Sequence, residues 1–309
     1  MRIVVALGGN ALLRRGEPMN MENQRRNVGQ AAGVIAKLAS AGHCPIVTHG
    51  NGPQVGLLAL QSASQAGAEL PLDVLDAESA GMIGYLLQQE LRNALPGRLV
   101  ATVLTQVRVD AADPAFLHPT KPIGLLYEED EAHRLSKACN WQMAQDNDKW
   151  RRVVPSPRPL EILEHEVISM LVDREVIVIC AGGGGIPVRQ TDAGALAGVE
   201  AVVDKDLASS LLARQLKADL LLMLTDVDAV YLDYGSARAR PLGTISADDI
   251  RHEDFAPGSM GPKVAAAAEF AKFSGKTAII GRLEEAVDLV SGKAGTRIHA
   301  AASSPVLVR

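Results

Sequence analysis

One pattern occurs three times in the chain and constrains the fold more than any other feature: an apolar run rich in β-branched residues ends in a turn that contains glycine. The three copies are residues 4–10, 46–56 and 176–185. In the second copy, Pro53 follows the turn, and proline suits the first position of a helix because its missing N–H would be unpaired there. The pattern predicts strand, tight turn and helix, with the turns at the carboxyl ends of strands, where open α/β sheets bind ligands.

Helical and strand-like segments alternate along the rest of the chain. Apolar spacings of three and four predict helices over residues 20–41 and 73–95, and Asn20 is a candidate N-cap for the first. Apolar runs at residues 99–105 and 219–225 predict buried strands. This alternation predicts an α/β fold with a mainly parallel central sheet and helices on both faces. Further helices are expected over residues 160–171, 207–216, 262–274 and 283–290, and a polar loop over 189–198.

A different pattern covers residues 110–157, where prolines bracket short segments. A short acidic helix at 128–135 precedes two short strands, and residues 146–149 between these strands suit a hairpin turn. We interpret this stretch as a small inserted flap. A boundary near Lys217 then divides the chain into residues 1–217, which include the flap, and residues 218–309.

The composition excludes several classes of partner. The formal net charge is −5, basic residues form no block, and aromatic residues make up only 3%, so the chain has no footprint for nucleic acid or for an anionic membrane surface. No apolar run approaches the length that crosses a membrane, and the three cysteines have no metal-binding spacing. We expect a cytoplasmic protein with reduced thiols and no metal site built from its own side chains.

Four glycine-containing turns favour a phosphate or another anion as ligand. The fourth lies at residues 258–263 and opens a predicted helix. None has the spacing of a P-loop or of a dinucleotide-binding loop. Backbone N–H groups in such turns bind anions, and Asn10 and Asn51 would add side-chain donors. Each turn alone is also ordinary loop geometry, but four in one chain favour an anion site.

Three lysines at turns supply the positive charge that such a site needs. Lys121 lies at the root of the flap, Lys205 lies between two aspartates, and Lys263 lies at a helix start. Phosphoryl transfer needs in-line positioning and cations on the oxygens of the transferring group, with little covalent chemistry from the protein. Asp206 could hold two of these ammonium groups in register, or it could cap the helix that follows. The residues alone leave both roles open.

Two carboxylates follow the apolar strand at residues 219–225. Asp226 and Asp228 could bind a metal or accept a hydrogen bond from a ribose hydroxyl, and they are equally ordinary turn residues. The histidines have neither metal-ligand spacing nor a paired nucleophile, so we assign them no catalytic role.

Seven motifs, in order along nearly the whole chain, resemble the carbamate kinases, a family of the amino-acid kinase superfamily. They are residues 6–12, 49–56, 119–124, 153–157, 181–188, 204–206 and 258–264. The resemblance implies a three-layer αβα sandwich with a small inserted protruding subdomain, usually as a homodimer. It also implies reversible phosphoryl transfer between Mg-ATP and carbamate, giving ADP and carbamoyl phosphate. Residues 1–217 would bind carbamate and residues 218–309 the nucleotide, and in arginine or allantoin catabolism the reaction would run toward ATP.

The resemblance assigns roles to individual residues. Lys121, Lys205 and Lys263 would neutralise the transferring phosphoryl group, and Asp206 would orient lysines. The residues that would hold carbamate or the phosphoryl group are Gly8, Gly9, Asn10, Gly50, Asn51, Gly52, Gly182 and Gly183. The residues that would line the nucleotide site are Thr225, Asp226, Asp228, Tyr231, Gly258, Met260 and Pro262. Mg²⁺ would enter with ATP or ADP.

One segment departs from the family pattern. Family members carry Gly-Arg-Gly before an aromatic-Arg-Arg-Val-Val segment, whereas residues 146–149 of this chain read Asp-Asn-Asp-Lys before Trp150.

Two alternative functions remain: a kinase of the same fold that acts on another small carboxylate, and a non-catalytic sensor of carbamoyl phosphate or nucleotide. The presence of all three lysines argues against the sensor.

Overall fold

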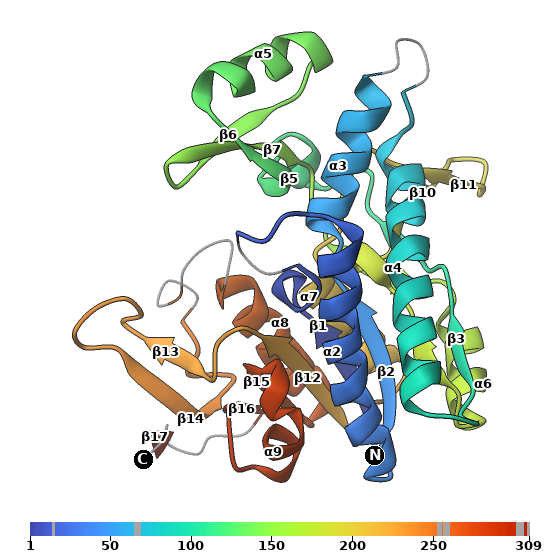
Figure 1. The fold of residues 1–309 in the computed structure, drawn as a ribbon, viewed down its shortest axis with the longest axis vertical. Helices are drawn as coiled ribbons and strands as arrows, with labels where there is room; N and C mark the ends of the chain where they lie inside the picture. The colour runs from blue at the N-terminus through green and yellow to red at the C-terminus, as the bar shows by residue number, and fades with distance from the viewer. Residues whose placement is uncertain (14–15, 65–68, 252–254, 256–259, 301–305, 308–309) are drawn as a thin grey trace.

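The computed structural model describes residues 1–309 except 14–15, 65–68, 252–254, 256–259, 301–305 and 308–309. Its core is a ten-stranded sheet in the order β13-β14-β16-β15-β12-β1-β2-β9-β3, with β17 paired to β14 (Figure 1). The strands are β1 (Arg2–Leu7), β2 (Cys44–His49), β3 (Val100–Thr102), β9 (Ile177–Ile179), β12 (Leu220–Thr225), β13 (Val230–Leu232), β14 (Arg240–Ser246), β15 (Thr277–Arg282), β16 (Thr296–His299) and β17 (Val306–Leu307).

Six adjacent strands of this sheet run parallel to one another. They are β3, β9, β2, β1, β12 and β15, whereas β16 pairs antiparallel with β15. Parallel strands are buried on both faces, which is why β1, β2 and β12 are continuous apolar runs in the sequence. The carboxyl ends of the six strands meet at one edge of the sheet, so the glycine turns that follow β1, β2 and β9 lie at the same edge.

Helices cover both faces of the sheet. One face carries α2 (Met21–Ser40), α4 (Leu72–Ala94) and α9 (Ala286–Ser291), and the other carries α6 (His165–Asp173), α7 (Lys205–Gln215) and α8 (Met260–Ser274). Along β1, Ile3 and Val5 pack on the face that carries α2, α4 and α9, while Val4 and Ala6 pack on the face that carries α6, α7 and α8. This alternation follows from the two-residue period of a strand. The three-layer α/β fold that we expected is therefore confirmed.

The long predicted helices are present, and the local signals that predicted them act as expected. Residues 20–41 and 73–95 correspond to α2 and α4. Asn20 is the N-cap of α2, because its side-chain oxygen accepts a hydrogen bond from the Asn23 backbone N–H at 2.9 Å. The described part of the chain also has four short helical segments, which are α1 (Gly9–Leu12), η1 (Pro114–Phe116), η2 (Gly182–Gly184) and η4 (Leu283–Glu285).

Two predictions between residues 159 and 198 were wrong. The helix expected over 160–171 starts only at His165, since β8 (Pro159–Ile162) pairs antiparallel with β4 (Gln106–Val109). The expected loop over 189–198 contains part of a hairpin formed by β10 (Ile186–Gln190) and β11 (Leu196–Gly198). Together these strands form a second sheet in the order β11-β10-β4-β8. The pairing joins segments far apart in the chain, so local spacing could not show it.

The flap is a third, separate sheet with one helix. Its order is β5-β7-β6, with β5 (Lys121–Tyr127), α5 (Glu129–Cys139), β6 (Met143–Asp146) and β7 (Lys149–Val154). Figure 1 shows this subdomain projecting at the top of the molecule, beside the upper part of α3 (Gly52–Ala63). The predicted hairpin is present: Asp146 pairs with Lys149, and Asn147 supplies the left-handed backbone (φ 58°) that glycine adopts more easily.

Helix α3 contacts the flap through two glycines. A Cβ atom on Gly56 of α3 would overlap the backbone of Gly124 in β5, and Gly124 itself has φ +76°. Only residues without side chains allow this approach of helix and strand. The contact holds β5, which begins at Lys121, against the N-terminal half of α3.

The main sheet continues across the boundary that we predicted near Lys217, because β1 pairs in parallel with β12. The division into residues 1–217 and 218–309 therefore stays a prediction. Within the described part of the chain, no helix combines the length and the apolar character needed to cross a membrane.

Candidate active site

Three charged residues in a row mark the start of α7: Asp204 is its N-cap, and Lys205 and Asp206 are its first two residues. Oδ1 of Asp204 accepts hydrogen bonds from the backbone N–H groups of Asp206 at 2.9 Å and Leu207 at 3.2 Å. The alternative that Asp206 caps this helix is therefore wrong. The residue before the first turn reaches the free N–H groups, whereas the side chain of Asp206 turns toward lysines.

Asp206 joins two lysines from different helices. Nζ of Lys205 donates to both carboxylate oxygens of Asp206 at 2.9 Å, and Nζ of Lys263, in the first turn of α8, donates to Oδ2 at 3.0 Å. Asp206 is only 4% exposed. Burial alone would raise the pKa of Asp206, but the two ammonium groups outweigh burial and lower it. The carboxylate therefore stays charged and holds both cations.

The two lysines differ in their electrostatic surroundings. Burial lowers the pKa of each, but at Lys205 the carboxylates of Asp206 and Asp204 outweigh burial, so its pKa is raised. Lys263 has Asp206 as its counter-charge and the Lys205 ammonium nearby, so burial prevails and its pKa is lowered. Two ammonium groups on one carboxylate leave excess positive charge at the site, which an anionic ligand would neutralise.

Lys121 reaches the same cluster from the flap. Its Nζ donates to Oδ2 of Asp204 at 2.6 Å. Burial would raise the pKa of Asp204, but Lys121 and Lys205 together lower it. One oxygen of Asp204 thus caps α7 while the other holds the flap lysine. The structure brings Lys121, Lys205, Asp206 and Lys263 into one charge network, as the sequence predicted for them.

The glycine turn after β2 lies directly against this network. A Cβ atom on Gly50 would lie 3.1 Å from Cδ of Lys205 and 3.7 Å from the backbone nitrogen of Gly9. The missing side chain therefore leaves room for the Lys205 stem to cross the turn. Gly52 is the first residue of α3, so the N-terminus of this helix also lies at the carboxyl edge of the sheet.

The turn after β1 lies beside it. The backbone N–H of Gly8 donates to the Leu224 carbonyl at 2.9 Å, which ties the turn to the end of β12. Gly9 begins the short helix α1. The backbone of Asn10 lies in α1, and its side chain lies outside the described part of the structure.

The turn after β9 requires glycine at successive positions because other groups occupy the space of each missing side chain. A Cβ atom on Gly182 would lie 2.6 Å from Nε2 of His49, and one on Gly183 would overlap the amide of Asn51. Gly183 also has a positive φ of 72°. His49 is buried, and burial lowers its pKa to about 4. It is therefore neutral, and it packs under the turn.

The side chain of Asn51 does not offer its N–H groups to a ligand in this structure, contrary to our expectation. Nδ2 donates to Oδ1 of Asp76 and to Oγ of Ser79, both at 2.8 Å. Asp76 and Ser79 are fully buried on α4. The sequence does not reveal these two residues, since a buried acid on an amphipathic helix has no signature beyond its position on the apolar face.

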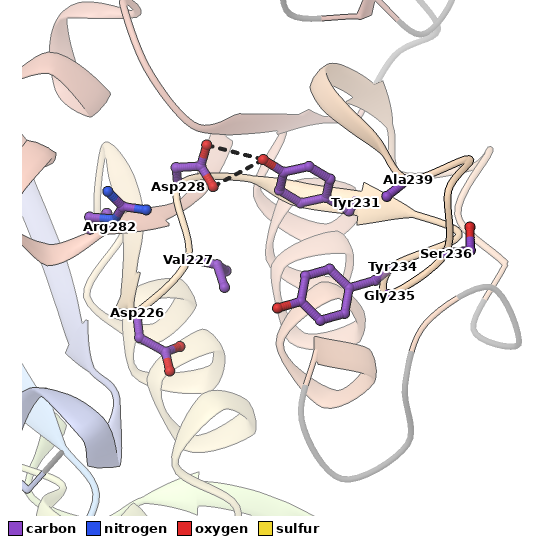
Figure 2. Close-up of a pocket in the computed structure, with 9 residues that line it drawn as sticks. All are labelled: Asp226, Val227, Asp228, Tyr231, Tyr234, Gly235, Ser236, Ala239 and Arg282. Carbon is purple, nitrogen blue, oxygen red and sulfur yellow. Dashed lines mark hydrogen bonds between the residues drawn. The ribbon is translucent and has the colours of Figure 1, made fainter. Parts of the chain in front are cut away.

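A separate pocket of about 600 Å³ lies beyond the ends of β12 and β15 (Figure 2). Of the predicted nucleotide residues, Asp226, Asp228 and Tyr231 line it. The Tyr231 hydroxyl donates to the Asp228 carboxylate at 3.1 and 3.2 Å. Two further lining residues were not predicted. They are Tyr234, whose ring centroid lies 5.9 Å from that of Tyr231 in an edge-on arrangement, and Arg282 at the end of β15.

The other predicted nucleotide residues that the structure describes, Thr225, Met260 and Pro262, do not line this pocket. Thr225 ends β12, and its hydroxyl donates to Asp226 at 3.1 Å. Met260 and Pro262 lie in the first turn of α8, the helix that carries Lys263, and neither is among the lining residues of the pocket in Figure 2. Gly258 lies outside the described residues.

The geometry suits a ligand that carries several negative charges. Lys205 and Lys263 are held in place by Asp206, Lys121 is held by Asp204, and the glycine turns after β1, β2 and β9 lie at the same edge of the sheet. Fixed cations and backbone N–H groups are the elements that stabilise a transferring phosphoryl group.

Comparison with known proteins leads to the same chemistry. A family model described as the amino acid kinase family matches residues 1–282. The carbamate kinase of Haemophilus influenzae is 56% identical over 300 residues, which are 96% of this chain and 96% of that protein. The carbamate kinase of Pyrococcus furiosus is 46% identical and is matched over 96% of this chain and 98% of its own length.

Solved structures agree in fold. The carbamate kinase from Giardia lamblia bound to AMP-PNP has a TM-score of 0.88 and 45% identity, covering 96% of this chain and 98% of that chain. The same protein bound to citric acid has a TM-score of 0.91. This chain therefore belongs to the carbamate kinases of the amino acid kinase family.

Proposed function

We propose that this carbamate kinase transfers a phosphoryl group from carbamoyl phosphate to ADP, giving ATP and carbamate, which breaks down to ammonia and CO₂, and that it also catalyses the reverse transfer. The observation that carries the proposal is Asp206, which holds the ammonium groups of Lys205 and Lys263 within 3.0 Å. A transferring phosphoryl group spreads negative charge over its outer oxygens. Cations fixed before the reaction stabilise that charge without reorganisation.

We assign the catalytic roles to this network. Lys121, Lys205 and Lys263 would contact the transferring phosphoryl group, and Asp206 would keep two of these lysines in register. Lys121 would exchange its contact with Asp204 for a contact with the phosphoryl oxygens when the ligand binds. The groups that we propose to bind carbamate and the phosphoryl group are Gly8, Gly9, Asn10, Gly50, Asn51, Gly52, Gly182 and Gly183.

We propose that residues 218–309 form the nucleotide-binding part, and that residues 1–217, which include the flap, form the carbamate-binding part. The pocket at the ends of β12 and β15 supports this division, since it has two tyrosine rings for a base and Arg282 for phosphate or ribose oxygens. The Giardia lamblia relative was solved with the ATP analogue AMP-PNP. The residues that we propose for this site are Thr225, Asp226, Asp228, Tyr231, Tyr234, Gly258, Met260, Pro262 and Arg282.

We propose that Mg²⁺ enters with the nucleotide. Among the described residues, no cluster of three His, Cys, Asp or Glu side chains could hold a metal ion by itself, and Asp204 and Asp206 are both engaged by lysines. This donor set fits an ion bound mainly by phosphate oxygens and water, as Mg²⁺ commonly is. Asp226 is the carboxylate that we propose to hold it. When bound, the ion would neutralise negative charge on the nucleotide phosphates.

We expect Arg282→Met to raise the KM for ADP about tenfold with little change in kcat, since a charge-assisted contact with phosphate would be lost equally from ground and transition states. Initial rates of ATP formation at varied ADP concentrations measure this. Arg240→Met is the matched control, because Arg240 is exposed on β14 and does not line the pocket. An unchanged KM for Arg282→Met would remove Arg282 from the site.

We expect Gly56→Ala to lower kcat by about 10²-fold, because the new methyl group displaces Gly124 and with it the strand that carries Lys121. A shift of about 1 Å in a catalytic group is enough for such a loss. Gly81→Ala on α4 is the control, since a Cβ atom there meets nothing within 4 Å. If Gly56→Ala kept its kcat, the flap would not need the glycine contact.

We also propose a homodimer in the cytoplasm. The three cysteines are free, which agrees with a reducing compartment. Light scattering of the purified protein at micromolar concentration measures the oligomeric state directly.

The donor specificity tests the proposed function. With ADP and Mg²⁺, we expect the purified protein to form ATP from carbamoyl phosphate at a kcat/KM far above that for acetyl phosphate. Equal use of both donors would favour a kinase for another small carboxylate. Binding of carbamoyl phosphate without ATP formation would favour the sensor.

A further inference from the structure

The orientation of the Asn51 amide is set by its neighbours on α4. The Ser79 hydroxyl lies 2.9 Å from the Leu75 carbonyl and 3.0 Å from the Asp76 carbonyl. A hydroxyl in a helix gives its one hydrogen to such a carbonyl, so Oγ of Ser79 is left as an acceptor. Oδ1 of Asp76 accepts as well. Both N–H groups of Asn51 therefore have acceptors on α4, and Nδ2 is the atom that faces this helix.

Asp76 has no other evident use. It is completely buried, and its second oxygen, Oδ2, has no hydrogen-bond partner in the described structure. Burial raises its pKa well above the usual value, although the hydrogen bond from Asn51 opposes this. A neutral carboxyl still accepts a hydrogen bond through its carbonyl oxygen. The contact with Asn51 is therefore independent of whether Asp76 carries a charge.

Gly183 fixes the plane of the same amide. A Cβ atom on Gly183 would overlap Nδ2 of Asn51 and would lie 2.6 Å from its Cγ and 2.8 Å from its Oδ1. The glycine backbone thus packs against the flat amide. With the N–H groups turned toward α4 and the plane fixed, Oδ1 is the polar atom of Asn51 that these contacts leave available.

The available atom is an acceptor that has no lysine partner, unlike the carboxylates of Asp204 and Asp206, which lysines engage. Asn51 follows Gly50, which lies against the Lys205 side chain, and precedes α3. Ammonium groups and backbone N–H groups suit the oxygens of carbamate and phosphate. Carbamate also has an amino group, whose N–H groups need an acceptor. Oδ1 of Asn51 has the chemistry for that one part of the substrate.

We propose that Asp76 and Ser79 are positioning residues that hold Oδ1 of Asn51 as the acceptor for the amino N–H of carbamoyl phosphate, and that this contact selects carbamoyl phosphate over acetyl phosphate. The inference rests on the proposed function and adds the source of its selectivity. Acetyl phosphate has a methyl group in place of the amino group. A bound methyl group leaves Oδ1 buried without a donor, and sites built to hydrogen-bond a group reject analogues that lack it.

The experiment measures kcat/KM for ATP formation with carbamoyl phosphate and with acetyl phosphate. For each variant, the donor ratio is the value for carbamoyl phosphate divided by the value for acetyl phosphate. Ser79→Ala and Asp76→Ala each free one N–H of Asn51, so the amide can turn over. We expect each to lower the ratio about tenfold, the scale of one unmade buried hydrogen bond. Asp76→Asn keeps an acceptor oxygen and should keep the ratio within about threefold of the original. Glu78→Ala, at an exposed position of α4, is the matched control.

The ratio separates this role from a purely structural one. Both donors are measured on the same preparation, so a partly unfolded variant lowers both rates and leaves the ratio unchanged. Ser79→Ala removes only one oxygen atom, so it tests the idea even if Asp76→Ala does not fold. If Ser79→Ala and Asp76→Ala both kept the donor ratio of the unmodified protein, the inference would be overturned while the proposed function stayed intact. Absence of donor preference in the unmodified protein would instead contradict the function itself.

Discussion

Asp206→Asn is expected to lower kcat for ATP formation by roughly 10²–10³, the scale for the loss of one preorganised electrostatic contact. Asn keeps the size of the side chain but removes the charge that holds Lys205 and Lys263 together. Because the α7 cap is Asp204, the substitution leaves the cap in place. The KM for ADP should change little, since the gain from the lysines appears when charge spreads in the transition state.

The same substitution should reduce stability in a way that depends on pH. At pH 7 we expect a loss of about 3 kcal/mol, because two nearly buried ammonium groups lose their shared counter-charge. The pKa of Asp206 is lowered in the folded protein, so its contribution is present above its unfolded pKa of about 3.9 and is lost as pH falls through the folded value. The difference in stability between the two proteins should therefore shrink in acid.

Steady-state kinetics and urea unfolding at several pH values measure both effects. Asp248→Asn is a matched control, since Asp248 forms an exposed ion pair with Lys272, and exposed pairs contribute little. Full activity of Asp206→Asn would remove Asp206 from the catalytic network and leave the three lysines to be tested alone.

Replacing residues 121–154 by a short glycine-serine linker is expected to reduce ATP formation by at least about 10³-fold while nucleotide binding is retained. Lys121 and Val154 are paired neighbours on antiparallel strands, about 5 Å apart, so a few residues close the gap. The flap sheet pairs only with itself in the described structure. Its removal takes away the Lys121 charge and the subdomain that we propose to cover the site and exclude water when the substrates bind.

Lys121→Met in the full chain separates these two contributions. It removes the charge but keeps the cover, so we expect a smaller loss, roughly 10²-fold. Equilibrium binding of ADP, followed by calorimetry, tests whether the nucleotide part is intact in both proteins. Wild-type turnover by the protein without the flap would show that neither the flap nor Lys121 is needed.

The sequence was most informative where a local rule determines the structure. Glycine turns after apolar runs predicted that these turns lie together at one edge of the sheet, because parallel strands place their carboxyl ends together. Asn20 predicted the start of α2, since capping involves only neighbouring residues. The turn positions of Lys121, Lys205 and Lys263 predicted the cations that the structure gathers.

The features that the sequence did not reveal depend on contacts between distant segments. β8 was read as part of a helix because its partner β4 lies far away in the chain. Asp204 and Asp206 are both suitable caps by residue type, and only their side-chain directions decide between them. Asp76 and Ser79 look like polar interruptions of an apolar helix face until Asn51 is placed beside them.

The most direct test of the account is a phosphorus NMR time course with the purified protein, ADP, Mg²⁺ and carbamoyl phosphate in one tube. The account predicts that the carbamoyl phosphate signal falls while the γ-phosphorus signal of ATP rises by the same amount, with no inorganic phosphate released beyond the enzyme-free rate. Release of inorganic phosphate without ATP, or no loss of carbamoyl phosphate beyond the enzyme-free control, would contradict it.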